Sequence, residues 1–108
     1  PTDPPKEKEI ETDNSVELFA PNAFTPDGNF TNNTWRVFIQ GVDIYDFHLT
    51  VYSRSGNVVW ESFNVDAEWD GNFSGNPAQE GIYVWALETK NAVTDERHYF
   101  NGFINVLR

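Results

Sequence analysis

Short runs in which apolar and polar residues alternate recur along this chain from residue 16 onward. Phe47–Tyr52 is the clearest of them, with Phe47, Leu49 and Val51 on one face and His48, Thr50 and Tyr52 on the other. Alternation with a period of two is typical of a half-buried β-strand. Because we find no stretch with convincing helical periodicity, the pattern predicts an all-β protein.

The other predicted strands are similar runs, bounded by Gly, Asn, Asp or Pro. They are Val16–Ala20, Trp35–Ile39, Val58–Glu61, Ile82–Thr89 and Arg97–Leu107. The strand Ile82–Thr89 is apolar on both faces, which predicts a central position between two layers. Gly102 is expected at a bulge or a close approach. About seven strands at this spacing predict an antiparallel immunoglobulin-like β-sandwich.

The loop Pro21–Asn29 combines turn-forming residues with two apolar ones, Ala23 and Phe24. Prolines, glycine, asparagines and aspartate favour turns, whereas the two apolar side chains favour burial. We therefore expect a shaped loop with an apolar anchor. Its candidate functional residues are Pro21, Asn22, Phe24, Pro26, Asp27 and Gly28.

Residues 1–15 differ in composition from the rest of the chain. They contain three prolines and five acidic residues, and Ile10 is their one large apolar side chain. Such a segment repels itself and favours an extended linker. We interpret residues 1–15 as an acidic linker that follows another domain, and residues 16–108 as a single folded domain.

The chain of 108 residues carries 17 acidic and 7 basic side chains, for a net charge of −10. This charge argues against binding to nucleic acid or to an anionic membrane surface. The absence of cysteine excludes disulfides and thiolate metal sites. No apolar run approaches the length of a membrane span, so we expect no direct membrane insertion.

Residues that could catalyse a reaction are few. His48 and His98 fall at solvent-type positions of predicted strands, without a nucleophile or acid pair at suitable spacing. The carboxylates of Asp66, Glu68 and Asp70 cluster around Trp69, but a small sandwich rarely supplies a glycosidase cleft. We expect Asp70 to cap a turn and the protein not to be an enzyme.

Calcium is the one metal that the loop could hold. Asp27, Asn29, Asn32 and Asn33 offer oxygen ligands along a glycine-containing segment. Ca²⁺ takes six to eight oxygens, and carboxylates supply most of the affinity. With one carboxylate the site would be weak, and asparagines that bridge the loop backbone are the alternative. We expect no cofactor.

Several aromatic residues cannot all fit on one interior face. They are Tyr52, Trp60, Trp85, Tyr99 and Phe103. An aromatic platform on a sandwich could stack sugar rings, which would make the protein a carbohydrate-binding or adhesive module. The alternative is a two-layer core with partial exposure, which is normal for aromatic residues.

Five segments, taken in order, resemble the motifs of gliding-motility-associated C-terminal domains, the type B sorting domains of the type IX secretion system in Bacteroidota. The segments are Pro21–Asn29 with Asn32–Trp35, Val51–Trp60, Trp69–Gly71 with Gly75, Glu80–Trp85, and Gly102–Arg108. The chain departs from the family pattern at Asn29 and Asn33, where the family usually carries Asp, at Phe30, where it carries Gly, and at Ser55, where it carries an aromatic residue.

The resemblance implies a non-catalytic sorting domain at residues 16–108 of a larger cell-surface or secreted protein. Such a domain passes through the periplasm and is exported across the outer membrane. Its implied partners are the secretion translocon and an outer-membrane protein similar to PorP/SprF. We expect the isolated domain to be monomeric.

Two groups of residues are candidates for specific roles in this domain. We expect Ile104, Val106, Leu107 and Arg108 to border the docking surface, on an exposed edge strand, or else to close the core. The expected structural anchors, besides Phe24, are Trp69, Asp70, Gly71, Gly81 and Tyr83.

Overall fold

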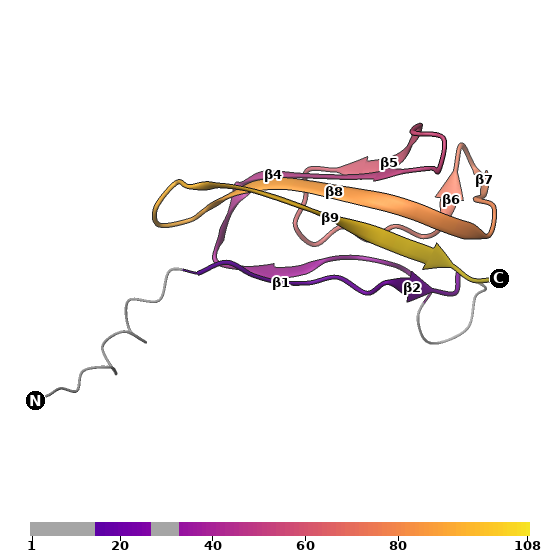
Figure 1. Cartoon of the computed structure of the whole chain (residues 1–108), viewed down its shortest axis with the longest axis horizontal. Helices are drawn as coiled ribbons and strands as arrows, with labels where there is room; N and C mark the ends of the chain where they lie inside the picture. The colour runs from indigo at the N-terminus through magenta and orange to yellow at the C-terminus, as the bar shows by residue number, and fades with distance from the viewer. Residues whose placement is uncertain (1–14, 27–32) are drawn as a thin grey trace, which may run out of the picture.

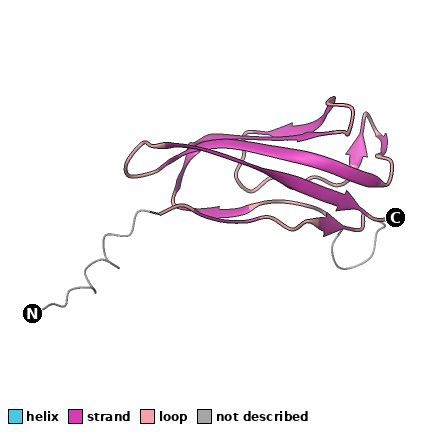
Figure 2. Cartoon of the chain, viewed as in Figure 1, coloured by secondary structure: helices cyan, strands magenta, loops and turns pink. Residues whose placement is uncertain are grey.

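The computed structural model describes residues 15–26 and 33–108 as an all-β domain (Figures 1 and 2). Its strands are β1 (Glu17–Phe19), β2 (Ala23–Phe24), β3 (Phe38–Gln40), β4 (Val42–Tyr52), β5 (Val58–Ser62), β6 (Asn72–Phe73), β7 (Asn76–Pro77), β8 (Gly81–Asn91) and β9 (Arg97–Val106). Nowhere in these two ranges is there a helix with the length and apolar character of a membrane span.

Two layers face each other across the core (Figure 1). One layer is a five-stranded sheet in the order β2-β9-β8-β4-β5, and the other contains the two-stranded ribbon β1-β3. A third pair, β6-β7, forms a small hairpin. The predicted all-β sandwich is confirmed. The antiparallel pattern holds for every strand pair except β2 and β9, which run parallel.

Two predicted strands differ most in their bounds. β4 begins at Val42 rather than Phe47, and its pairing with β8 shifts register between these two residues. The predicted strand Trp35–Ile39 is shorter, since Phe38–Gln40 alone pairs with β1. Trp35 instead forms an isolated bridge with Trp69.

The strand β8 corrects one expectation. It is central within the five-stranded sheet, but the structure covers one of its faces rather than both. Tyr83, Trp85 and Leu87 face the core and are at most 8% exposed, whereas Ile82 and Val84 are 38% and 42% exposed on the outer face. The prediction that β8 lies between two layers is therefore wrong, because it assumed that the apolar residues on both faces are buried.

The core is built around large aromatic side chains. Trp35 and Trp69 are fully buried, and the ring of Trp35 lies 6.0 Å from that of Trp85. Gly102 lies under Trp85, where an added Cβ would come within 2.7 Å of the indole nitrogen. The predicted close approach at this glycine is therefore present, and it lets β9 pack against the largest side chain of β8.

Candidate recognition site

The first part of the Pro21–Asn29 loop is tied to the last strand. Phe24 is 3% exposed and its ring lies 5.5 Å from that of Trp69. The backbone N–H of Asn105 donates to the carbonyl of Asn22 at 2.8 Å, and the N–H of Leu107 donates to the carbonyl of Phe24 at 3.0 Å. Residues 21–26 thus follow a defined path along β9. Asp27 and Gly28 lie outside the described residues.

Arg108 contacts two regions that are far from it in the sequence, the Pro26 loop and the two ends of the β6-β7 hairpin. Its guanidinium donates to the carbonyl oxygens of Ala78 at 2.8 Å, Gly71 at 2.9 Å and Pro26 at 3.2 Å. A planar guanidinium with five donors suits such a task, because it can reach several carbonyls at once. The end of the chain therefore fixes the relative positions of the loops that contain Pro26, Gly71 and Ala78.

The C-terminal end of β9, just before Arg108, is covered by a neighbouring strand and is not an exposed edge of the sheet. β9 lies between β8 and β2, and Ala23 and Phe24 pair with Asn105 and Val106. Ile104 and Val106 are fully buried, so their side chains cannot contact a partner of the folded domain. Of the two alternatives left open by the sequence, burial of Ile104 and Val106 favours a strand that closes the core over an exposed edge. Leu107, at 41% exposed, and Arg108 remain candidates for the border of a docking surface.

Trp69 and Tyr83 meet at the same end of the core. Their rings lie edge to face, 5.4 Å apart. The indole N–H of Trp69 donates to the carbonyl of Asn72 at 3.0 Å, and the hydroxyl of Tyr83 donates to the carbonyl of Gln79 at 2.6 Å. Each ring therefore fills space in the core and holds one turn of the β6–β7 region.

The two glycines and the aspartate among the expected anchors lie beside these rings. Asp70 accepts a hydrogen bond from the backbone N–H of Asn72 at 3.0 Å, which is the turn-capping contact that the sequence predicts. Gly71 has a φ of +82°, and a Cβ there would lie 2.7 Å from Pro26 Cγ. Gly81 starts β8 and pairs with Val106 of β9. All three residues thus lie close to the segments that Arg108 connects.

The candidate calcium ligands fall mostly outside the described residues. Asp27, Asn29 and Asn32 lie there, and Asn33 is the one member that the structure places. The side-chain oxygen of Asn33 is buried without a hydrogen-bond partner among the described residues. Within that part of the chain, no three His, Asp or Glu side chains are grouped closely enough to hold a metal ion. The expectation of no cofactor and its alternative, a weak calcium site, both stay predictions.

The two histidines lie on opposite faces of the large sheet. His48 Nε2 is 2.6 Å from a carboxylate oxygen of Glu61, and its ring stacks on Phe63 at 4.4 Å. His98 stacks on Phe100 at 5.8 Å. His48 thus lies on the outer face, as predicted. His98 instead faces the core side of β9 beside the buried Thr89, and its Nε2 has no hydrogen-bond partner among the described residues, so the solvent-type position predicted for His98 is wrong.

At the start of β9, Arg97 pairs with two carboxylates. It donates to both carboxylate oxygens of Asp46, at 2.9 and 3.1 Å, and to Glu88 at 2.8 Å. The hydrogen bond from Arg97 holds the pKa of Asp46 below its usual value, and the same contact raises the pKa of Arg97. This cluster lies at the opposite end of β9 from Arg108.

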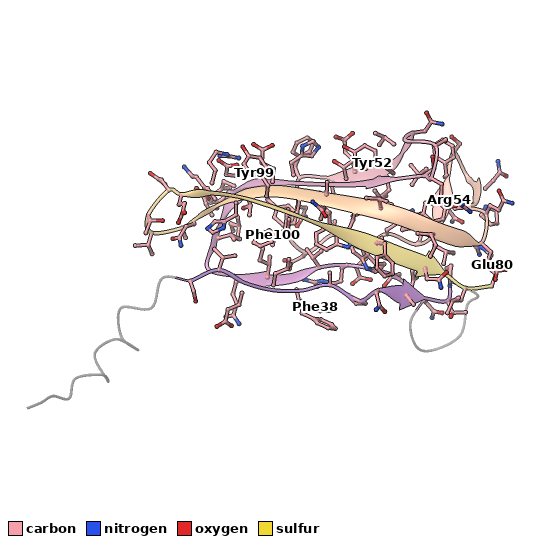
Figure 3. All side chains as sticks on the ribbon, viewed as in Figure 1. Phe38, Tyr52, Arg54, Glu80, Tyr99 and Phe100 are labelled. Carbon is pink, nitrogen blue, oxygen red and sulfur yellow. The ribbon has the colours of Figure 1, made fainter. Side chains whose placement is uncertain are left out.

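The aromatic residues do not form one exposed platform. Trp85 is 5% exposed and belongs to the core, and Trp60 is partly buried against it, so neither tryptophan of the predicted sugar-stacking set is fully exposed. Tyr99 and Phe103 are 69% and 54% exposed on the outer face of the large sheet. Figure 3 shows Tyr52 and Tyr99 on this face. Phe38 lies in the other layer, on β3, and projects outward from the molecule.

The structure also exposes aromatic residues that the sequence analysis did not single out. Phe19 and Phe38 are cross-strand partners on the outside of the β1-β3 ribbon, with ring centroids 6.1 Å apart. Phe73 is 46% exposed on the β6-β7 hairpin. The residues around Gly75 predict a long turn region, but they do not predict the two short strands of this hairpin or what its side chains face.

Comparison with known proteins decides the family. A family model described as the CHU_C type IX secretion signal domain matches residues 18–106. The chain belongs to this family. No curated protein and no solved structure matches the chain.

As a type IX secretion signal domain, the chain carries a secretion signal. It acts with the type IX secretion machinery, and it serves export to the cell surface or to the outside. The family is defined by this signal and not by a catalytic activity. The matched range spans described residues from β1 to the end of β9, and so includes both layers of the sandwich.

Proposed function

We propose that this domain is the sorting signal of a larger cell-surface or secreted protein, and that a protein similar to PorP/SprF recognises it at the outer membrane. The passenger crosses the periplasm and then passes through the type IX translocon. In this proposal the domain acts as a monomer and without catalysis. Recognition depends on a folded surface rather than on a linear peptide.

One observation carries the proposal. Segments that contain Pro26, Gly71 and Arg108 belong to separate motifs in the sequence, yet Arg108 bonds to the carbonyls of the other two. The turn Ser53–Asn57 lies at the same end, next to the start of β8, where both contribute to one surface hollow. A partner at this end of the sandwich could contact several family motifs at once, which supports recognition of the folded domain.

The test is a fusion of the whole chain to a periplasmic reporter. The host carries the type IX secretion system, with or without the PorP/SprF-like partner. We expect the reporter outside the cell when both are present and in the periplasm when the partner is deleted. A fusion that stays in the periplasm of the complete host, while circular dichroism shows a folded domain, would contradict the proposal.

A carbohydrate-binding or adhesive module is the second candidate. It is favoured by the exposed rings of Tyr99 and Phe103, which lie on adjoining stretches of β9 on the outer face of the sheet. Binding of the purified chain to an oligosaccharide array, abolished by Tyr99→Ala, would support this candidate. Secretion of the fused reporter without any sugar binding would leave sorting as the function.

We also propose that the domain needs no cofactor. Of the four candidate calcium ligands, Asp27 alone carries a charge, so a site built from them would be weak. A ligand that binds the native state raises stability only when its concentration exceeds its dissociation constant. We expect 1 mM Ca²⁺ to leave the melting temperature unchanged, and a clear rise would instead establish a calcium site.

A further inference from the structure

Two hairpins enclose a groove beside the free edge of the large sheet. The β4–β5 turn contributes Ser53 and Asn57, and β5 contributes Val59. The β6-β7 hairpin contributes Phe73 and Asn76. The remaining lining residues are Ser74, Pro77, Ala78, Gln79 and Tyr83, and the groove measures about 450 Å³. In Figure 1 the two hairpins project side by side at the end of the molecule that holds the C-terminus.

Both walls of the groove are held in place by short-range bonds. In the β4–β5 turn the backbone N–H of Ser53 donates to Asn57 at 2.8 Å, and the N–H of Gly56 donates to Ser53 at 2.9 Å. In the β6-β7 turn Ser74 has a φ of 56°, and it is followed by a glycine that also has a positive φ. Such two-residue turns match the twist of their strands. The groove is therefore largely preformed.

The lining of the groove carries no acidic or basic side chain. This neutrality stands out in a chain with a net charge of −10. The floor is apolar and aromatic, with Phe73 46% exposed to an incoming group. The rim contains the amides of Asn57, Asn76 and Gln79, and each amide offers both donors and acceptors. An occupant with an apolar side chain and neutral amide groups fits this chemistry.

The edge strand next to the groove favours a polypeptide over a sugar. β5 is the last strand of the five-stranded sheet and pairs with β4 alone. Its sequence Val58-Val59-Trp60-Glu61-Ser62 contains no proline or lysine, and its one charged side chain, Glu61, is paired with His48 of the neighbouring strand. A strand added at such an edge gains main-chain hydrogen bonds, while neighbouring hollows accept alternate side chains. Val59 belongs both to this edge and to the groove.

We propose that the β5 edge and this groove bind an extended, uncharged segment of the partner protein. One apolar or aromatic side chain of that segment enters the groove against Phe73, and its backbone pairs with β5. This inference rests on the proposed sorting function, since it names the surface by which the partner reads the domain. The segment is neutral because a charged group that entered the groove would lose hydration without meeting a charged partner in the lining.

Two pairs of matched variants test the proposal in the whole chain fused to the reporter. Phe73→Ser removes the exposed aromatic of the groove, and Phe19→Ser removes one that is 64% exposed on the opposite layer. Asn76→Asp places a charge in the groove, and Asn101→Asp places the same charge on exposed β9. We expect the two groove variants to lower secretion about tenfold or more, the loss typical of a binding hot spot, and the two controls to secrete normally.

The readout separates recognition from folding. Melting temperatures of the four purified variants should stay close to that of the parent, because all four side chains are exposed. A photoreactive phenylalanine analogue at Asn57 should cross-link to the PorP/SprF-like partner, and one at Val93 on the far Ala92–Glu96 turn should not. Normal secretion of both groove variants, with no cross-link at Asn57, overturns the inference.

These outcomes also distinguish the inference from the function on which it rests. If the parent fusion is secreted but the groove variants behave like their controls, sorting stands and the groove is not its reading surface. If the parent fusion is not secreted, the sorting function itself fails. Binding of cellotriose to the groove, or a dimer that Asn76→Asp dissociates, would replace the partner segment with a sugar or with a second copy.

Discussion

Trp35 and Trp69 exchange two backbone hydrogen bonds, from Trp35 N–H to Trp69 at 2.9 Å and from Trp69 N–H to Trp35 at 2.8 Å. Both indoles are fully buried. The indole N–H of Trp35 donates to the carbonyl of Pro21 at 2.6 Å, and that of Trp69 donates to Asn72 at 3.0 Å. The segments around Trp35 and Trp69 lack regular strand pairing, and this pair therefore holds both of them against the core.

Trp69→Ala should destabilise the domain by about 3–5 kcal/mol, because it opens a cavity and leaves the carbonyl of Asn72 without its indole donor. Urea unfolding followed by circular dichroism measures this change. Phe63→Ala, at a side chain that is 66% exposed, is the control and should cost little. Secretion of Trp69→Ala should fail because the signal is unfolded, so equal stability of the two variants would argue against the anchor role.

Arg108→Ala should lower the free energy of unfolding by about 1–3 kcal/mol, because a charged donor to three carbonyls is removed. Arg108→Lys keeps the positive charge but lacks the planar guanidinium with its several donors, so it should retain only part of the stabilisation that Arg108→Ala removes. Arg54→Ala, at an exposed residue of the neighbouring turn, serves as the control. Full rescue by lysine would mean that charge alone matters at this position.

Gly102→Ala should cost about 1–3 kcal/mol, because the new methyl group would overlap the indole of Trp85. The displaced indole should also change the tryptophan fluorescence of the native state. Asn101→Ala on the same strand is exposed and should change neither property. An unchanged melting temperature in Gly102→Ala would show that β9 can move away from β8 without loss.

Asp46→Asn should destabilise the domain at pH 7 and lose this effect in strong acid. The pair with Arg97 holds the pKa of Asp46 below its usual 3.8. The stabilisation is therefore complete above the unfolded pKa and disappears as the pH falls through the lower folded value. Melting temperatures at pH 7 and pH 2 measure the difference. In an Arg97→Gln background, Asp46→Asn should have no further effect at either pH.

Local patterns were enough to predict most of the large sheet. The alternation at Phe47–Tyr52 and the turn at Ser53–Asn57 predict β4 and its hairpin to β5, and both are present. The two-residue strand β2 could not be predicted, because its parallel pairing with β9 joins residues more than 80 positions apart. Burial of β8 on both faces was also predicted wrongly, since an apolar residue such as Val84 need not be covered.

The candidate site was predicted less completely than the fold. The motifs identified the turns at Pro26 and Gly71, but not the contacts of Arg108 with both. Arg108 bonds to backbone carbonyls, which every residue type has, so the sequence of its partners does not reveal the contact. The sequence left open whether Ile104 and Val106 border a docking surface or close the core, and the structure buries both. Whether a strand end is open depends on its neighbour in the sheet, here β2, which the sequence did not reveal.

The parallel pairing of β2 with β9 determines how the domain responds to tension between its two ends. The bonds from Asn105 to Asn22 and from Leu107 to Phe24 connect strands that run in the same direction. Pulling on the two ends therefore loads both bonds in shear, so that they must break together rather than one after the other. Single-molecule stretching should show a distinct force peak, which Asn105→Pro, by removing one donor, should lower.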